Sequence, residues 1–232
     1  KLEALRTELG AGELPVLLAD ATDRPSLDAL AAQTQVVCAC AGPYALYGSE
    51  VVGACVAQGA HYCDLSGEVP WMRRMVDRYH EAAAAKGVKI VHSCGFDSVP
   101  SDMGVMFFLD VAKARHGAYC SAVHYRLVGG KGGFSGGTYA SLNNVLREAG
   151  QDPGVMDILA DPYALNPPGE RQGPDEPDLM GVAYDEQAGA WIGPFVMASI
   201  NTRIVRRSQA LQGYPYGRDF RYDEAMLTGK GL

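Results

Sequence analysis

Residues 36–65 read VVCACAGPYALYGSEVVGACVAQGAHYCDL, and this stretch decides the fold class. Val36–Ala41 is an uninterrupted apolar run, which is typical of a strand buried on both faces. Ser49–Gln58 has apolar residues at helical spacing and ends before Gly59, and His61–Leu65 is a second short strand. Two strands joined by a helix form a βαβ unit, so the stretch predicts an α/β fold with a parallel sheet.

The same alternation continues on both sides of this unit. Further helices are predicted at Lys1–Leu9, Ser26–Ala32, Pro70–Lys86 and Ser101–Ala114, and further strands at Leu14–Ala19 and Val88–His92. Parallel sheets bind ligands beyond the carboxyl ends of their strands. The loops of interest are therefore Asp20–Asp23, Ala41–Tyr44, Asp64–Glu68 and Ser93–Ser98.

The second half of the chain has a different pattern. Tyr119–Leu127 alternates apolar and polar residues, which predicts a strand with one buried face, and it leads into the glycine-rich segment Gly129–Gly137. Helices are predicted from about Thr138 and from Pro194. We therefore predict a partial dinucleotide-binding domain over residues 1–116 and an incomplete α+β domain, for substrate binding or dimerisation, over residues 117–232.

Composition excludes several classes of protein. With 47% hydrophobic residues the chain is globular, and a net charge of −7 argues against a nucleic-acid-binding protein. No apolar run approaches the roughly 18 residues of a membrane span. The six cysteines form no Cys-x-x-Cys pair and no disulfide scaffold is expected, which predicts a reducing, cytoplasmic compartment. Cys38 and Cys40 would point to the same face of a strand, and they are interpreted as buried thiols rather than soft metal ligands. No metal site is predicted, because the histidines show no paired spacing.

Four stretches in register carry a family resemblance. They are AGPYALYG (Ala41–Gly48), VVGACVAQGAHYCDLSGE (Val51–Glu68), VHSCGFDSVPSDMG (Val91–Gly104) and GGFSGGTYAS (Gly132–Ser141). Together they resemble the saccharopine dehydrogenase-like oxidoreductases, and more closely the trans-acting enoyl reductase branch of lipid, glycolipid and polyketide biosynthesis. The resemblance implies a Rossmann-like nicotinamide-binding domain joined to an α+β domain. It implies NADP or NAD as cofactor, with NADP favoured.

One hallmark of the implied fold is absent from this sequence. No G-x-G-x-x-G turn occurs, although this turn brings the pyrophosphate of a dinucleotide to a helix N-terminus. Comparison with the family implies that the chain starts after the first strands of the sheet and also lacks a C-terminal portion. We expect a longer polypeptide to supply those strands; the alternative is that Leu14–Ala19 pairs directly beside Val36–Ala41. The isolated fragment is expected to be inactive.

The resemblance and the strand ends together nominate cofactor-binding residues. Asp20 and Asp23 would lie beside the adenine, and backbone groups of the other nominated residues would contact the ribose, nicotinamide or carboxamide. In the alternative interpretation, all are ordinary turn and cap residues. The nominated residues are Asp20, Asp23, Ala41, Gly42, Pro43, Tyr44, Cys94, Gly95, Phe96 and Asp97.

Catalytic and substrate-binding candidates lie on the same loops. Tyr47 is the leading candidate for the proton donor, with Asp97 as a residue that orients it. The glycine-rich segment presents amides at a helix start, which suits an anion or carbonyl, although it could equally be a hairpin tip. Its nominated substrate-binding residues are Gly133, Ser135, Gly136 and Thr138. Five arginines (Arg203, Arg206, Arg207, Arg218 and Arg221) either meet a phosphate or head group or pair with the acids of residues 170–186.

The predicted function is an NAD(P)-dependent oxidoreductase, an enoyl-type reductase acting on a lipid or polyketide acyl substrate. The alternative is a non-catalytic Rossmann-like binding or scaffold module. The resemblance allows a carrier-bound substrate, peripheral membrane contact of a cytoplasmic protein, and a homodimer.

Overall fold

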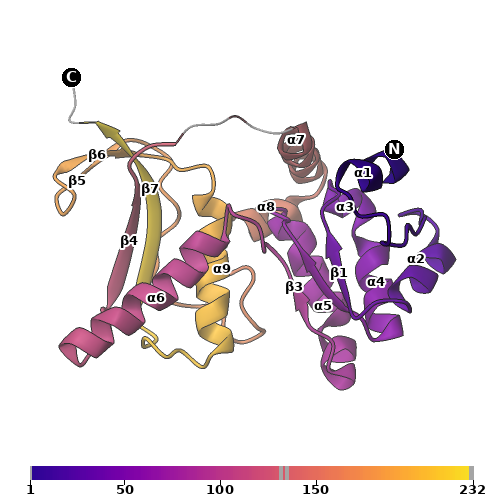
Figure 1. Ribbon diagram of the computed structural model, residues 1–232. Helices are drawn as coiled ribbons and strands as arrows, with labels where there is room; N and C mark the ends of the chain where they lie inside the picture. The colour runs from indigo at the N-terminus through magenta and orange to yellow at the C-terminus, as the bar shows by residue number, and fades with distance from the viewer. Residues whose placement is uncertain (1, 131–132, 134–135, 230–232) are drawn as a thin grey trace.

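The computed structural model describes residues 2–130, 133 and 136–229, and it contains two sheets with helices around them (Figure 1). The elements of the first half alternate helical segments and strands from residue 24 onward, as the sequence predicts. They are α1 (Leu2–Glu8), α2 (Arg24–Ala31), β1 (Val36–Ala39), α3 (Tyr44–Tyr47), α4 (Ser49–Gln58), β2 (His61–Asp64), α5 (Val69–Lys86), β3 (Ile90–Val91) and α6 (Val99–His116).

The first sheet is parallel, in the order β1-β2-β3. Val36 is paired with His61 and Tyr62 with Ile90, so each strand runs in the direction of its neighbour. Helix α4 makes the crossover from β1 to β2 and ends at Gly59, whose φ of 82° lies in the left-handed region that glycine adopts freely. This sheet confirms the predicted α/β fold class with a Rossmann-like parallel sheet.

The predicted strand at Leu14–Ala19 is wrong. The segment has no regular structure, and Leu18 is 83% exposed. A strand needs a partner for its amides and carbonyls, and within the described residues β1 pairs only with β2. The alternative in which Leu14–Ala19 pairs beside Val36–Ala41 is therefore also wrong.

Strand β1 is less buried than its composition predicts. Cys38 and Cys40 are exposed, and their sulfur atoms lie 3.9 Å apart on one face. Val37 and Ala39 pack against the core on the opposite face. The interpretation of Cys38 and Cys40 as buried thiols is therefore wrong, because the described helices cover only the opposite face of the strand.

A single hydrophobic core joins this sheet to its helices. Trp71 of α5 is 1% exposed, and its indole nitrogen donates to the Ser49 hydroxyl at 3.0 Å. It packs with buried side chains from β2, α4 and α5, among them Tyr62, Val52 and Met72. Burial of each such side chain stabilises the fold by about 1.5–3 kcal/mol. The cluster therefore fixes the positions of the strand ends of the parallel sheet.

The second half contributes a mixed sheet. Its elements are β4 (Ala122–Leu127), α7 (Gly136–Gln151), α8 (Pro153–Ala160), β5 (Ala183–Asp185), β6 (Ala190–Gly193), α9 (Ala198–Leu211) and β7 (Arg221–Gly229). The strand order is β4-β7-β6-β5, with β4 and β7 parallel and the other pairs antiparallel. Helices α6 and α9 pack on it through Leu109, Val205 and Tyr222. The predicted second α+β layer is present, whereas strands β5, β6 and β7 were not predicted.

Helices α7 and α8 return from the second half to the first, beside α3 and α5 (Figure 1). Arg74 of α5 forms an ion pair with Glu148 of α7 at 3.0 Å. On another side, a Cβ at Gly67 would lie 2.9 Å from Ile200 of α9, so the loop after β2 approaches that helix closely. The chain division at residue 116 stays a prediction, since segments on both sides of it share these contacts.

Candidate functional site

The loops that follow β1, β2 and β3 meet at one edge of the parallel sheet, and Asp64 holds two of them together. The Asp64 carboxylate accepts hydrogen bonds from the amides of Ser66 and Ser93, both at 3.0 Å. The second carboxylate oxygen of Asp64 lies 2.7 Å from Nδ1 of His92, and the Nδ1–H group of the imidazole donates a hydrogen bond to it. The amide of Cys94 donates to the Asp64 carbonyl at 2.7 Å. This buried carboxylate therefore fixes the entry to the β3 loop.

Glu68 fixes the third loop and was not nominated from the sequence. It is 2% exposed, and its carboxylate accepts from the amides of Tyr44 at 2.8 Å and Ala45 at 2.9 Å. The hydroxyl of Ser141, on α7, donates to the same carboxylate at 2.8 Å. One buried side chain thus caps α3 and attaches α7 to the strand ends.

The loop after β1 exposes backbone rather than side chains. Ala41 and Gly42 are exposed, and their backbone groups form no hydrogen bond within the described part of the chain. Pro43 stands at the N-cap of α3. Tyr44 is buried, its hydroxyl donates to the Ala39 carbonyl at 2.9 Å, and burial raises its pKa to about 12. Tyr44 therefore supports the loop, while Ala41 and Gly42 are available to a ligand.

The loop after β3 presents a run of free amides. Gly95, Phe96 and Asp97 donate no backbone hydrogen bond among the described residues, and they directly precede the N-terminus of α6. Phe96 is 88% exposed, and burial raises the pKa of the Cys94 thiol. A Cβ at Gly95 would lie 3.0 Å from Cβ of Leu65, so this position favours glycine. Convergent amides at a helix start suit a carboxamide oxygen or an anion, so these residues fit the nicotinamide end of the implied cofactor.

The two aspartates near residue 20 have local structural contacts. Asp20 accepts from the amide of Thr22 at 2.8 Å and from its hydroxyl at 2.7 Å, and these bonds lower the pKa of Asp20. Asp23 stands at the N-cap of α2 without a side-chain cap bond. Their contact with an adenine stays a prediction.

The remaining nominated residues lie near α3 and α7. Tyr47 ends α3, is 44% exposed, and its hydroxyl has no hydrogen-bond partner within the described residues. Gly136 and Thr138 lie in the first turn of α7, Gly133 precedes it, and Ser135 lies outside the described residues. A Cβ at Gly42 would lie 3.6 Å from the Ser141 hydroxyl, so the structure brings α7 beside the β1 loop.

Most of the arginine cluster is paired internally. Arg203 pairs with Asp178 at 2.7 Å, and Arg206 pairs with Asp175 at 2.9 Å. Arg218 pairs with Glu170 at 2.7 Å. The interpretation in which the arginines pair with the acids of residues 170–186 therefore holds for these three, and the first two pairs are buried rather than solvated.

The described ranges, residues 2–130, 133 and 136–229, contain neither a candidate metal cluster nor a helix that could span a membrane. In those ranges no three His, Cys, Asp or Glu side chains converge in a way that could hold a metal ion. No helix built from them has the length and apolar character that crossing a membrane requires.

Comparison with known proteins places this geometry in a family context. The saccharopine dehydrogenase NADP-binding domain family matches residues 1–91. The chain is 45% identical, over 97% of its length and 56% of the relative's, to a Mycobacterium tuberculosis protein provisionally named a trans-acting enoyl reductase. It is 39% identical to a trans-acting enoyl reductase of Mycobacterium leprae, over 99% of this chain and 57% of that protein. The chain thus spans somewhat more than half the length of these relatives.

Proposed function

We propose that this protein is an NAD(P)-dependent enoyl reductase, because residues 1–91 match the saccharopine dehydrogenase NADP-binding domain family and the chain is similar throughout to trans-acting enoyl reductases. NADP is the favoured cofactor. The observation that carries the proposal is the set of free amides at Gly95, Phe96 and Asp97, which follows strand β3 just beyond the stretch that the family matches.

Each residue of the site has a proposed role. When bound, the nicotinamide supplies the hydride that reduces the C=C bond of the substrate. The amides of Gly95–Asp97 hold the carboxamide, and the exposed backbone of Ala41 and Gly42 forms the wall beside the ring. Tyr47, which is exposed and unpaired within the described residues, donates the proton, and Asp97 orients it.

The proposed substrate is an acyl group of a lipid or polyketide, free or bound to a carrier. The start of α7, including Gly133, Gly136 and Thr138, would bind its carbonyl end. Large apolar side chains exposed beside the β3 loop support a lipid-like substrate, namely Phe96, Met103 and Phe107 at 88%, 51% and 71% exposure. The same surface supports peripheral membrane contact or a homodimer of a cytoplasmic protein as further proposals.

A fluorescence titration tests the reductase proposal. NADPH and NADH are added to the natural-length protein, and nicotinamide emission is followed with increasing protein. The proposal predicts a saturable response with tighter binding of NADPH. No saturable response to either nucleotide would overturn it in favour of a non-catalytic scaffold module.

A further inference from the structure

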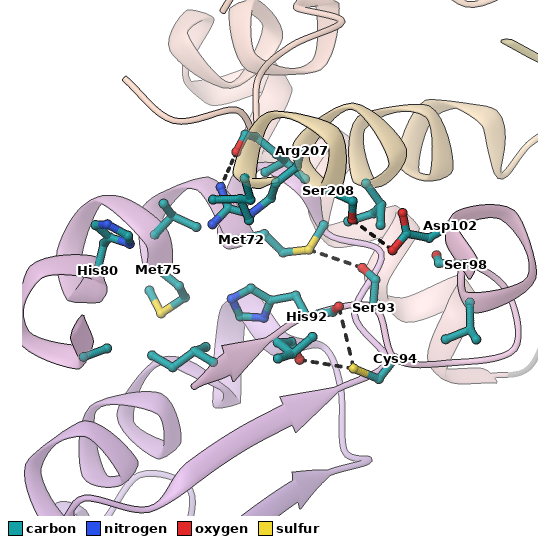
Figure 2. Close-up of a pocket in the computed structure, with 18 of the residues that line it drawn as sticks. Met72, Met75, His80, His92, Ser93, Cys94, Ser98, Asp102, Arg207 and Ser208 are labelled. Atoms are coloured by element: carbon teal, nitrogen blue, oxygen red, sulfur yellow. Dashed lines mark hydrogen bonds between the residues drawn. The ribbon is translucent and has the colours of Figure 1, made fainter. Parts of the chain in front are cut away.

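A second site lies on the α5 side of strand β3, away from the exposed backbone of Ala41 and Gly42. It is a cavity of about 480 Å³ between α5, β3, the start of α6 and α9 (Figure 2). This volume falls within the roughly 300–1,000 Å³ of small-molecule pockets. Its walls are mainly apolar, with Met72 and Met75 from α5, Ile90 from β3 and Ile204 from α9. Such a cavity suits a flexible hydrocarbon group.

One cation in the wall lacks an anionic partner. Arg207 of α9 lines the cavity, and its guanidinium donates one hydrogen bond, to the Leu165 carbonyl, as Figure 2 shows. Its other nitrogens form no hydrogen bond, and it forms no ion pair, within the part of the chain that the structure describes. Arg203, Arg206 and Arg218 on the same segment all have carboxylate partners.

The surroundings of Arg207 also disfavour its positive charge. Burial lowers its pKa, and the like charge of Arg73 lowers it further. Arg73 itself is paired with Asp77. The other titratable groups that line the cavity are His80, His92, Cys94 and Asp102.

None of those four groups neutralises Arg207. Nδ1 of His92 is hydrogen-bonded to Asp64, and Asp102 accepts a hydrogen bond from the Ser208 hydroxyl at 2.9 Å. His80 is exposed on α5. A partly buried guanidinium without a counter-ion is unfavourable, and a ligand carboxylate would relieve it with charge-assisted hydrogen bonds.

We propose that this cavity binds an amphiphilic carboxylate of the fatty-acid class. Its carboxylate pairs with Arg207, and its hydrocarbon chain lies against Met72, Met75 and Ile204. The inference does not rest on the reductase proposal, because it concerns binding without a cofactor at Arg207, Met72, Met75 and Ile204, which the proposed reaction does not use.

Calorimetric titration of the natural-length protein tests the site. The probe is dodecanoate, with dodecanol as the uncharged control and acetate as the control without a chain. Dodecanoate should bind saturably, and both controls should bind at least about tenfold more weakly, because a charge-assisted bond or a buried chain each contributes more than 1.4 kcal/mol.

Matched variants locate the binding. Arg207→Gln should weaken dodecanoate at least about tenfold, whereas Arg218→Gln, at an exposed ion pair, should leave it unchanged. Ala84→Trp places a bulky side chain at an exposed lining position of α5, and it should abolish binding. Ala85→Trp, exposed one position further along and outside the lining, should not. Absence of saturable dodecanoate binding, or an unchanged affinity in either Arg207→Gln or Ala84→Trp, overturns the proposal.

Discussion

Replacing Glu68 by Gln should destabilise the protein more than the same change at an exposed glutamate of its first half. The Glu68 carboxylate is 2% exposed and accepts three hydrogen bonds, from the amides of Tyr44 and Ala45 and from the hydroxyl of Ser141. A glutamine offers one oxygen, and its NH2 group would face an amide that also donates. At least one buried N–H therefore loses its partner.

The magnitude follows from those contacts. A hydrogen bond to a charged group contributes about 1.5–3 kcal/mol, and a buried unsatisfied donor costs about 1–3 kcal/mol. These contributions overlap, so we expect Glu68→Gln to lower the free energy of unfolding by about 2–4 kcal/mol. Ser141→Ala removes one bond only, and it should lower that free energy by about 1 kcal/mol.

Urea unfolding measures both effects through the shift in midpoint at unchanged slope. The matched control is Glu50→Gln, whose carboxylate is 40% exposed and pairs with Arg24 at 3.1 Å. That change should cost no more than about 1 kcal/mol, as is usual for exposed ion pairs. A Glu68→Gln variant as stable as Glu50→Gln would refute the assignment of Glu68 as the residue that holds α3 and α7 together.

Three further predictions concern acidity, packing and catalysis. Burial raises the pKa of Glu224 above its usual 4.5. Between the usual and the raised pKa, the folded protein retains a proton that the unfolded chain has released. The free energy of unfolding of the wild type therefore falls as pH rises through this range. The stability of Glu224→Gln relative to wild type should therefore rise as the pH increases above 4.5 in thermal unfolding, and a flat difference would contradict this. Gly48→Ala would place a Cβ 2.7 Å from the Trp71 ring and 2.9 Å from the Tyr44 carbonyl oxygen, so it should lower the unfolding free energy by about 1–3 kcal/mol. Gly104→Ala lies in the interior of α6, with nothing within 4 Å of the added Cβ, so it should raise the unfolding free energy by about 0.5–1 kcal/mol. Equal effects of Gly48→Ala and Gly104→Ala would contradict this packing. Tyr47→Phe should reduce kcat by about 10²-fold or more while NADPH affinity is kept, whereas Tyr184→Phe on the second sheet should change neither; unchanged turnover removes Tyr47 as the proton donor.

Local periodicity in the sequence was sufficient to predict the βαβ framework. Helix α4 was predicted with its observed bounds because Gly59 ends it, and the strands of the parallel sheet follow from short apolar runs. Leu14–Ala19 has the same apolar character, yet it forms no strand, because pairing depends on a neighbour that a local pattern does not specify. Strands β5, β6 and β7 were missed for the related reason that their mixed sheet is built from non-local pairings.

The candidate site was predictable in part. The loops after β1 and β3 follow from the rule that ligands bind at strand ends, and the structure places their free backbone groups there. Glu68 and His92 were not nominated, because their roles come from contacts with Ser141 and Asp64 across the fold. Arg207 could not be separated from its neighbouring arginines by sequence, since only the three-dimensional pairing shows which cation lacks a carboxylate.

Hydrogen–deuterium exchange of the natural-length protein with and without NADPH tests the cofactor site most directly. The account predicts slower exchange at Ala41–Gly42 and at Gly95–Asp97, whose amides are free within the described residues, and little change in β5 and β6 of the second sheet. Protection by NADPH that spares both of these loops would contradict it.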